Sequence, residues 1–319
     1  MEKSRILKGL DYLFVLRPSL FFPAWTIVLV GAFAAQRFEG HWTPLGFWKG
    51  TLIFGLYTLI VGAVYLLNNI MDQDNDAANG KVFLISEDYL SPRHASQYLV
   101  WILVVVGVLS LMVSRSLFLW FLGIFLVWGV LYSAPPFALK DKPMGGVFIS
   151  AISGIGLFAF GWWLYAPVGG IALWWHAIPY VLAWVSISLL TTIPDSNGDA
   201  LDNKQTIAVT WGHDKTQDNA FLLLILALLG SLLTWDWVIG ISSLLALPLY
   251  VKMKQDRSVA STLRVIRWGV SFLSFTMFIV YPVYFFSCFI VFFLSRWYYR
   301  ERFGINYPTF RVNDDEVNS

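Results

Sequence analysis

Long apolar runs alternate with short polar segments along the whole chain. Nine of these runs approach the length of about 20 residues that an α-helix needs to cross the hydrocarbon core of a bilayer. They cover residues 18–37, 47–70, 95–114, 116–134, 144–166, 172–194, 219–235, 237–253 and 269–295. Only Thr234, Trp235 and Asp236 separate the seventh run from the eighth, which predicts a tight helical hairpin. The pattern therefore predicts an all-α membrane protein, a bundle of nine transmembrane helices.

The composition of the chain favours a membrane protein over a soluble one. Of its 319 residues, 57% are hydrophobic and 13% are charged, about half of the charged fraction of an ordinary soluble domain. The net charge of +2 does not indicate nucleic-acid binding, because the basic residues lie between the apolar runs. The single cysteine, Cys288, excludes an intrachain disulfide and a thiolate zinc site. We expect residues 1–312 to form one domain and residues 313–319 a disordered polar tail.

The distribution of lysine and arginine predicts the orientation of the spans. Basic residues precede the first run and follow the second, fourth, sixth and eighth runs, whereas none follow the fifth and seventh directly. This asymmetry places the N-terminus on the cytoplasmic side. Four arginines after the ninth run disagree, since nine spans would place them outside: Arg296, Arg300, Arg302 and Arg311. Either they reach the headgroups by snorkelling, or the predicted number of spans is wrong by one.

Two clusters of carboxylates follow apolar runs, although acidic residues are costly near a bilayer. The first cluster has the spacing i, i+4, i+8 and the second the spacing i, i+4, i+7, so each aligns three side chains on one helix face. The aligned residues are Asn68, Asp72 and Asp76 in the first cluster, and Asp195, Asp199 and Asp202 in the second. Carboxylates suit a hard cation such as Mg²⁺, which commonly bridges to phosphates. Two such clusters on the cytoplasmic side of one central cavity would hold a diphosphate through metal.

Two other interpretations of the acidic clusters stay open. In the first, the clusters are ordinary acidic loops beside a membrane, as we expect for Asp74. In the second, they form the site of a cation-coupled membrane transporter. Transport carboxylates commonly lie near the bilayer midplane, where helices are broken. The clusters follow helix ends instead, and no ionisable residue lies near Pro248 or Pro282, which interrupt apolar runs. The placement therefore favours phosphate chemistry over transport.

Further short motifs accompany the acidic clusters. The first cluster reads Asn68-Asn69-x-x-Asp72-x-x-x-Asp76. The second reads Asp195-x-x-x-Asp199-x-x-Asp202 and continues as Lys204-Gln205-Thr206-Ile207-Ala208-Val209. A Y-S-x-P-P-x-x-L-K stretch runs from Tyr132 to Lys140, and Arg17-Pro18 leads into the first apolar run. In this order, and over nearly the whole chain, these motifs resemble the UbiA-type superfamily of intramembrane prenyltransferases.

The resemblance implies an enzyme that transfers a prenyl group, with Mg²⁺ as the cofactor that ionises a prenyl diphosphate. It implies four metal ligands, Asp72, Asp76, Asp195 and Asp199, with Asn68 and Asp202 completing or orienting the coordination shell. Lys140 is the expected cationic contact to phosphate. Tyr132 would hydrogen-bond a phosphate oxygen or shield a carbocation with its ring. The implied partners are the prenyl diphosphate donor, a small hydrophobic or aromatic acceptor and membrane lipid, with no nucleic acid.

The chain departs from the family pattern at two places. Asn69 stands where the family has aspartate, and because it is turned away from the Asn68 face we expect the loss of a secondary contact rather than of metal. The segment after the first motif lacks the usual Arg-Pro pair, and Lys81 is the candidate for the missing cation. Lys81 and Arg93 are equally well explained as topology residues, and we expect Arg17 to reach the headgroups. The histidines are scattered singly and predict no metal site: His41, His94, His176 and His213.

The acceptor is the open question at this point. The leading hypothesis is a small aromatic acceptor on a route to quinones or prenylated lipids. No span interior offers a basic residue deep in the expected cavity, which favours an acceptor without a carboxylate or one that is held by the loop lysines. The same family also includes transfer to carotenoid or ether-lipid acceptors and terpene cyclisation, and these alternatives stay open.

Overall fold

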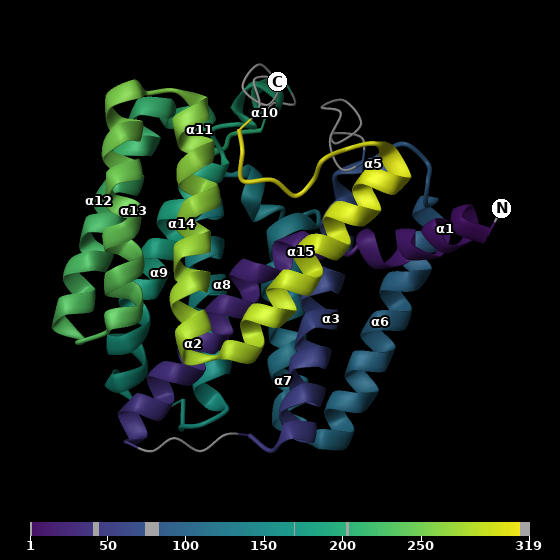
Figure 1. Ribbon diagram of the computed structural model, residues 1–319, viewed down its shortest axis with the longest axis horizontal. Coiled ribbons are helices and arrows are strands. Elements are labelled where there is room, and N and C mark those ends of the chain that lie inside the picture. Colours follow the sequence, from purple (N-terminus) through teal and green to yellow (C-terminus); the bar gives the residue numbers. More distant parts are fainter. Residues whose placement is uncertain (1, 41–44, 74–82, 169, 202–203, 313–319) are drawn as a thin grey trace. The chain divides into compact units, whose positions relative to one another are not determined.

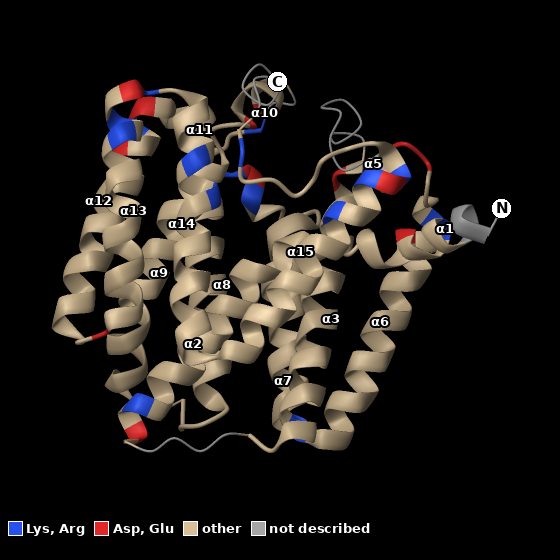
Figure 2. Cartoon of the chain, viewed as in Figure 1, with Lys and Arg blue, Asp and Glu red and all other residues tan. Residues whose placement is uncertain are grey.

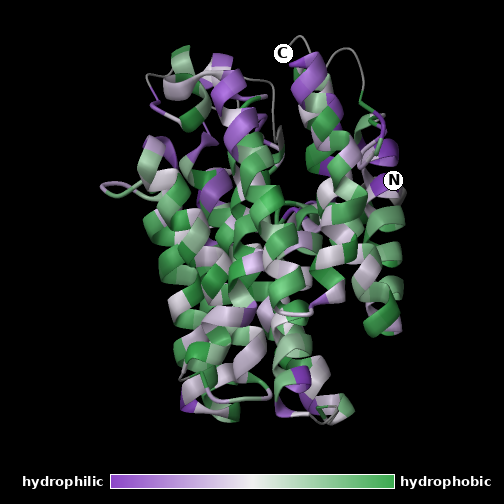
Figure 3. Cartoon of the chain, turned by 90° about the vertical axis from the view of Figure 1, so that its left-hand side faces the viewer, coloured by the Kyte–Doolittle hydropathy of each residue, from purple (hydrophilic) through white to green (hydrophobic). Residues whose placement is uncertain are grey.

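The computed structural model describes residues 2–40, 45–73, 83–168, 170–201 and 204–312, and every regular element in these ranges is a helix (Figure 1). The all-α prediction is therefore confirmed for the described residues. Within the described ranges, eight stretches are able, by length and composition, to cross a membrane. They are Ile6–Glu39, Phe47–Met71, Pro92–Val113, Pro143–Trp163, Ile171–Thr191, His213–Leu233, Trp237–Asp256 and Val259–Val280. Hydrophobic residues dominate the bodies of the helices, and hydrophilic residues gather at their ends (Figure 3).

The chain divides into two compact units. Unit 1 comprises Met1–Phe22, Thr43–Ala138 and Ser287–Pro308. Unit 2 comprises Pro23–Trp42, Leu139–Phe286 and Thr309–Ser319. The predicted tail, residues 313–319, lies outside the described residues.

Unit 1 is organised around a long central helix, α3. Its elements are α1 (Glu2–Phe14), η1 (Pro18–Leu20), α3 (Phe47–Met71), α5 (Phe83–Ser86), α6 (Pro92–Val113), α7 (Arg115–Ile124), the π-helix η2 (Phe125–Leu131) and most of α15 (Pro282–Phe303). Helix α3 packs against α6 and η2, and α6 packs against α7. A buried ion pair joins α1 to α15, because the Asp11 carboxylate accepts hydrogen bonds from Tyr298 Oη at 2.6 Å and from Arg302 Nη2 at 3.1 Å.

Unit 2 is organised around α9. Its elements are α2 (Phe21–Glu39, from Pro23 onward), η3 (Leu139–Asp141), α8 (Pro143–Trp163), α9 (Ile171–Thr191), α10 (Ser196–Leu201), α11 (Ile207–Trp211), α12 (His213–Leu233), α13 (Trp237–Asp256) and α14 (Val259–Val280). Helix α9 packs against α8, α12 and α14, and α13 packs against α12 and α14. Their shared core includes Leu190, Ala220, Tyr250 and Val265.

Glycines allow two close helix approaches in unit 2. A Cβ at Gly161 of α8 would lie 2.8 Å from the carbonyl carbon of Val28, and one at Gly31 of α2 would lie 2.9 Å from that of Phe158. In α12, a Cβ at Gly230 would lie 3.0 Å from Cγ of Pro179, which is inside α9. Small residues at such crossings let membrane helices pack closely, where dispersion rather than exclusion of water holds them together.

Polar side chains inside unit 2 find partners across the helix contacts. The Ser186 hydroxyl contacts Tyr250 Oη at 2.7 Å and donates to the Ala220 carbonyl at 2.6 Å. The Ser242 hydroxyl contacts Thr276 Oγ1 at 2.8 Å. A buried polar atom without a partner is costly, so these pairs fix which faces of α9, α12, α13 and α14 meet.

Six of the predicted apolar runs correspond closely to single helices, and the others need correction. The run 18–37 begins with η1, so α2 starts at Phe21, and the run 116–134 divides into α7 and the shorter π-helix η2. The run 269–295 is not one span: α14 ends at Val280 and α15 begins at Pro282. Proline disfavours helical backbone at the preceding residue, and Tyr281 accordingly has φ −126° and ψ 83°. The predicted span over residues 269–295 is therefore interrupted at Tyr281, and the count of nine spans is not confirmed.

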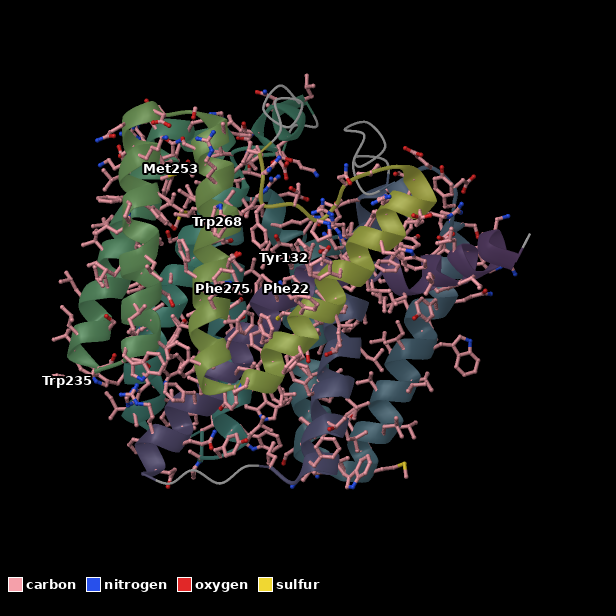
Figure 4. The ribbon with its side chains drawn as sticks, viewed as in Figure 1. Phe22, Tyr132, Trp235, Met253, Trp268 and Phe275 are labelled. Carbon is pink, nitrogen blue, oxygen red and sulfur yellow. The ribbon has the colours of Figure 1, made fainter. Side chains whose placement is uncertain are left out.

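Charged residues gather at the helix ends of unit 2. One group lies at the end that carries α10 and α11, and a smaller group lies where α2 ends (Figure 2). Figure 4 shows Trp235 at the tip of the α12–α13 hairpin and Met253 near the other end of α13. The tight turn at residues 234–236 is confirmed, and Trp235 is 86% exposed there. An exposed tryptophan at a helix end is typical of a membrane interface.

Candidate active site

The first acidic motif ends helix α3 in unit 1. Asn68 lies in the last turn of α3, and Asp72 is the residue at which the helix ends. The Asn68 side-chain amide donates to Asp72 Oδ2 at 2.9 Å and to Ser133 Oγ at 3.1 Å. The two motif residues therefore share one helix face, as their spacing predicts. Because both amide hydrogens donate, Asn68 Oδ1 is the atom that can face a ligand.

Asn69 has a structural role in the described part of unit 1. Its side chain is buried, and its Nδ2 donates to the backbone carbonyl of Val15 at 3.0 Å. Val15 follows α1, just before the chain turns at Arg17 with left-handed φ 57° and ψ 54°. Asn69 thus holds the α1–η1 junction against α3, and an aspartate could not make this hydrogen bond while ionised.

Tyr132 follows directly on the π-helix η2, which packs against α3. The next residue, Ser133, is buried and bonded to Asn68, so the end of η2 is joined to the first motif. Single π-turns inside helices are frequent at functional sites. Unit 1 therefore brings Asn68 and Asp72 together with the beginning of the Tyr132–Lys140 stretch.

The second acidic motif follows helix α9 in unit 2. The backbone N–H of Asp199 donates to the Asp195 carbonyl at 2.9 Å, so the two residues are one helical turn apart. The N–H of Lys204 donates to the Asp199 carbonyl at 2.8 Å, which brings the segment after the motif back to α10. Partial burial raises the pKa of the Asp199 carboxyl above its ordinary value. The Lys204 ammonium opposes this rise and the Asp195 carboxylate adds to it.

The turn η3, which carries Lys140, is joined to the segment after the second motif. The Asp141 carbonyl accepts a hydrogen bond from the N–H of Gln205 at 3.0 Å. The Asp141 carboxylate lies 3.9 Å from Lys204 Nζ. Lys140 is partly buried at the centre of this turn. Unit 2 therefore places a lysine of the Tyr132–Lys140 stretch beside the chain that follows Asp195 and Asp199.

A histidine that the sequence did not single out also reaches the second motif. His213 Nε2 lies 2.8 Å from the hydroxyl of Ser196, the residue directly after Asp195. His213 is the first residue of α12, after Gly212 with φ 80°. No spacing in the sequence predicts this contact, because it is made between two separate segments.

Several predicted site residues lie outside the described residues: Asp76, Lys81 and Asp202. Arg93 is exposed in the first turn of α6. Within the described ranges, no group of three Asp, Glu, His or Cys side chains is arranged to hold a metal ion. The described part of each motif offers two oxygen-bearing side chains, Asn68 with Asp72 and Asp195 with Asp199.

These donors fit a hard divalent cation. All of them present oxygen atoms, the ligand type that Mg²⁺ prefers. The raised pKa of Asp199 also means that its negative charge is poorly compensated by the protein alone. A bound dication would supply that compensation, because such ions are often the largest charges in a site and reverse local pKa shifts.

Comparison with known proteins gives consistent results. A model of the UbiA prenyltransferase family matches residues 24–259. The chain is 29% identical over 189 residues to homogentisate phytyltransferase of Synechocystis sp.. This match covers 54% of the chain and 59% of that relative, so the chain spans less than two thirds of the curated relative that it matches.

Solved structures share the fold at low sequence identity. A UbiA homologue from Archaeoglobus fulgidus bound to GPP and Mg²⁺ superimposes with a TM-score of 0.63 and 16% identity, over 85% of this chain and 99% of that one. An apo UbiA homologue from Aeropyrum pernix K1 gives a TM-score of 0.64 and 14% identity, over 81% and 97%. A structure of digeranylgeranylglyceryl phosphate synthase gives a TM-score of 0.60 and 19% identity, over 88% and 98%.

Proposed function

Because the chain belongs to the UbiA prenyltransferase family, we propose that it transfers a prenyl group from a prenyl diphosphate to a small aromatic acceptor, with Mg²⁺ as its cofactor. As a member of this family it is an integral, multi-pass membrane enzyme. The observation that carries the finer proposal is the presence of both acidic motifs, one at the end of α3 and one after α9. The lysine distribution further supports a cytoplasmic location for both motifs.

In unit 1, Asp72 and Asp76 are the proposed metal ligands. Asn68 holds the Asp72 carboxylate through its amide, and Ser133 holds Asn68 in turn. Such outer partners fix the orientation of a ligating carboxylate. Tyr132 is the proposed neighbour of the diphosphate or of the cationic prenyl carbon.

In unit 2, Asp195 and Asp199 are the proposed ligands, with Asp202 as an orienting residue. Lys140 is the proposed contact to a phosphate oxygen, because the hydrogen bond between Gln205 and Asp141 fixes its turn beside this motif. Lys81 is proposed for the same role from the segment after the first motif.

The reaction separates diphosphate from an allylic carbon, and negative charge grows on the leaving oxygen. Mg²⁺, when bound, supplies Lewis-acid stabilisation of that charge. The acceptor's ring carbon forms the new bond to the allylic carbon once the C–O bond to diphosphate has broken, and the ring then releases a proton to water or to the diphosphate. The residues of the chain hold the carboxylates in place and neutralise phosphate oxygens with lysine. A site closed to water would favour the acceptor, because water would otherwise capture the prenyl cation first.

The nature of the acceptor is proposed from the curated relative. That relative is named a homogentisate phytyltransferase, which indicates an aromatic acceptor on a route to quinone-type lipids. The proposed partners are therefore a prenyl diphosphate, an aromatic acceptor and the surrounding membrane lipid.

The proposal is tested with detergent-purified protein, Mg²⁺ and homogentisate, offering geranyl, farnesyl, geranylgeranyl and phytyl diphosphate in turn. Products are identified by mass spectrometry. A prenylated aromatic product is expected with at least one donor. In a parallel reaction, lipid extract is supplied instead of homogentisate. A prenylated membrane lipid as the product would contradict the aromatic acceptor and indicate a lipid acceptor. A hydrocarbon product without acceptor would indicate cyclisation.

A further inference from the structure

The side chain of Ser196 connects the second acidic motif to the start of α12. Ser196 is buried, and its hydroxyl donates to the Ile193 carbonyl at 2.8 Å. The same hydroxyl lies 2.8 Å from His213 Nε2. A serine hydroxyl has one hydrogen to give, and it is committed to Ile193. The two contacts together therefore assign Ser196 as the acceptor and the Nε2–H tautomer to His213.

His213 occupies a fixed position. It opens α12, and the Thr216 hydroxyl donates to the Gly212 carbonyl at 2.8 Å, which closes the first turn. Helix α12 packs against both α9 and α13 in the core of unit 2. The imidazole thus extends from a long, packed helix to a short one.

Helix α10 depends on contacts from its neighbours, of which its packing against α11 is one. It is six residues long, Ser196–Leu201, and a helix this short is not stable by itself. Its Leu201 is 84% exposed and so supplies no core contact. Asp195 and Asp199 lie on either side of Ser196, one turn apart. A hydrogen bond to Ser196 therefore acts on the residue between the two carboxylates.

We propose that His213 is a positioning residue for the second acidic motif, holding Asp195 and Asp199 in their mutual orientation through the Ser196 hydroxyl. The proposal rests on the proposed function, in that these carboxylates bind the divalent cation. His213 acts through Ser196 and has no contact with substrate in this assignment.

The test measures metal binding separately from turnover. The first readout is the Mg²⁺ concentration that gives half-maximal release of diphosphate, with the KM for the prenyl diphosphate measured alongside. The second is the rise in melting temperature that Mg²⁺ and inorganic diphosphate cause in the absence of a prenyl donor. The variants are His213→Ala, His213→Gln, Ser196→Ala and the double variant His213→Ala/Ser196→Ala.

The variants are expected to change the affinity for Mg²⁺. Loss of an orienting partner commonly weakens metal affinity about tenfold, so His213→Ala should raise the half-saturating Mg²⁺ concentration about tenfold and reduce the melting shift. His213→Gln can donate from a similar position and should restore most of the affinity. The double variant should be no weaker than Ser196→Ala, because both changes break one hydrogen bond.

His94 offers a matched control. Its Nδ1 lies 2.8 Å from the Ser91 hydroxyl at the start of α6, and that serine belongs to neither acidic motif. His94→Ala should leave the Mg²⁺ dependence unchanged. The proposal is overturned if His213→Ala binds Mg²⁺ like the wild type, or if the wild type shows no melting shift with Mg²⁺ and diphosphate.

The two proposals fail in different ways. A melting shift in the wild type that His213→Ala weakens, without diphosphate release from any donor, would contradict the proposed function and support the role of His213. If His213→Ala does not fold, Ser196→Ala and His213→Gln decide the matter, and unchanged Mg²⁺ dependence in Ser196→Ala would overturn the proposal.

Discussion

The close approach of α2 and α8 gives a prediction with a magnitude and a sign. In Gly161→Ala the new Cβ would lie 2.8 Å from the Val28 carbonyl carbon and 3.0 Å from the backbone nitrogen of Ala32. Carbon atoms prefer a separation of about 3.5–4.0 Å. The Val28 carbonyl oxygen lies closer still to the new Cβ. The two backbones must therefore move apart by more than about 1 Å to restore ordinary contact, because a carbonyl group, unlike a side chain, has no rotamer through which to move away.

This separation weakens the contacts along the whole crossing. A gap of about 0.5–1 Å already loses a quarter to a half of the dispersion energy of each affected pair. Overpacking of this kind costs about 1–3 kcal/mol. Replacing glycine by alanine within a helix returns about 0.5–1 kcal/mol. Because the new Cβ meets backbone atoms, the cost lies at the upper end of this range, and the expected net loss for Gly161→Ala is about 2 kcal/mol, a fall of a few degrees in melting temperature.

Gly156 provides the matched control on the same helix. A Cβ at Gly156 would meet no atom within 4 Å. Gly156→Ala should therefore keep only the helical gain and raise the melting temperature. Both variants are compared by tryptophan fluorescence during heating in detergent. Equal stability of Gly161→Ala and the wild type, or equal losses in the two variants, would refute the reasoning.

Three further predictions concern polar groups. Asp199→Asn should abolish turnover and raise the melting temperature of metal-free protein at neutral pH, because the raised pKa of Asp199 means that its ionised form is disfavoured in the fold. This destabilisation is absent well below the ordinary pKa of the carboxyl and fully present above the raised pKa. The gain in melting temperature should therefore vanish at acidic pH. Arg302→Ala should destabilise the protein by about 3 kcal/mol or more, because it leaves the buried Asp11 carboxylate without its cation. In a denaturation series, the double variant Arg302→Ala/Asp11→Ala should recover part of the lost free energy of unfolding. Asn69→Asp should lower stability by about 1–3 kcal/mol, because it removes the donor to Val15 and places an acceptor opposite a carbonyl; unchanged melting would contradict this role of Asn69.

The apolar pattern was sufficient to predict the helices but not all of their ends. Pro248 lies inside α13 and Pro282 begins α15, although both interrupt apolar runs in the same way. The difference depends on tertiary packing, because neighbouring helices can support a kinked helix within a bundle. The π-helix at residues 125–131 likewise has no signature in hydrophobic periodicity.

The local parts of the candidate site were predictable, and the contacts between segments were not. The i, i+4 spacing correctly placed Asn68 and Asp72 on one face, and the same spacing placed Asp199 one turn after Asp195. The partners of these residues, Ser133 and His213, come from segments that are distant or separately folded. Ser133 belongs to the Tyr132–Lys140 stretch, but nothing in that stretch identifies Asn68 as its partner. Single histidines are too common in sequences for a contact such as that of His213 to be predicted without the fold.

The central claim, that both acidic motifs serve metal-dependent cleavage of a prenyl diphosphate, is tested most directly by diphosphate release. Wild type, Asp72→Asn and Asp195→Asn would be titrated with Mg²⁺ at saturating geranylgeranyl, farnesyl and phytyl diphosphate. The account predicts Mg²⁺-dependent release by the wild type with at least one donor, and loss of most of that release in either variant. Full release without Mg²⁺, or by both variants, would contradict it.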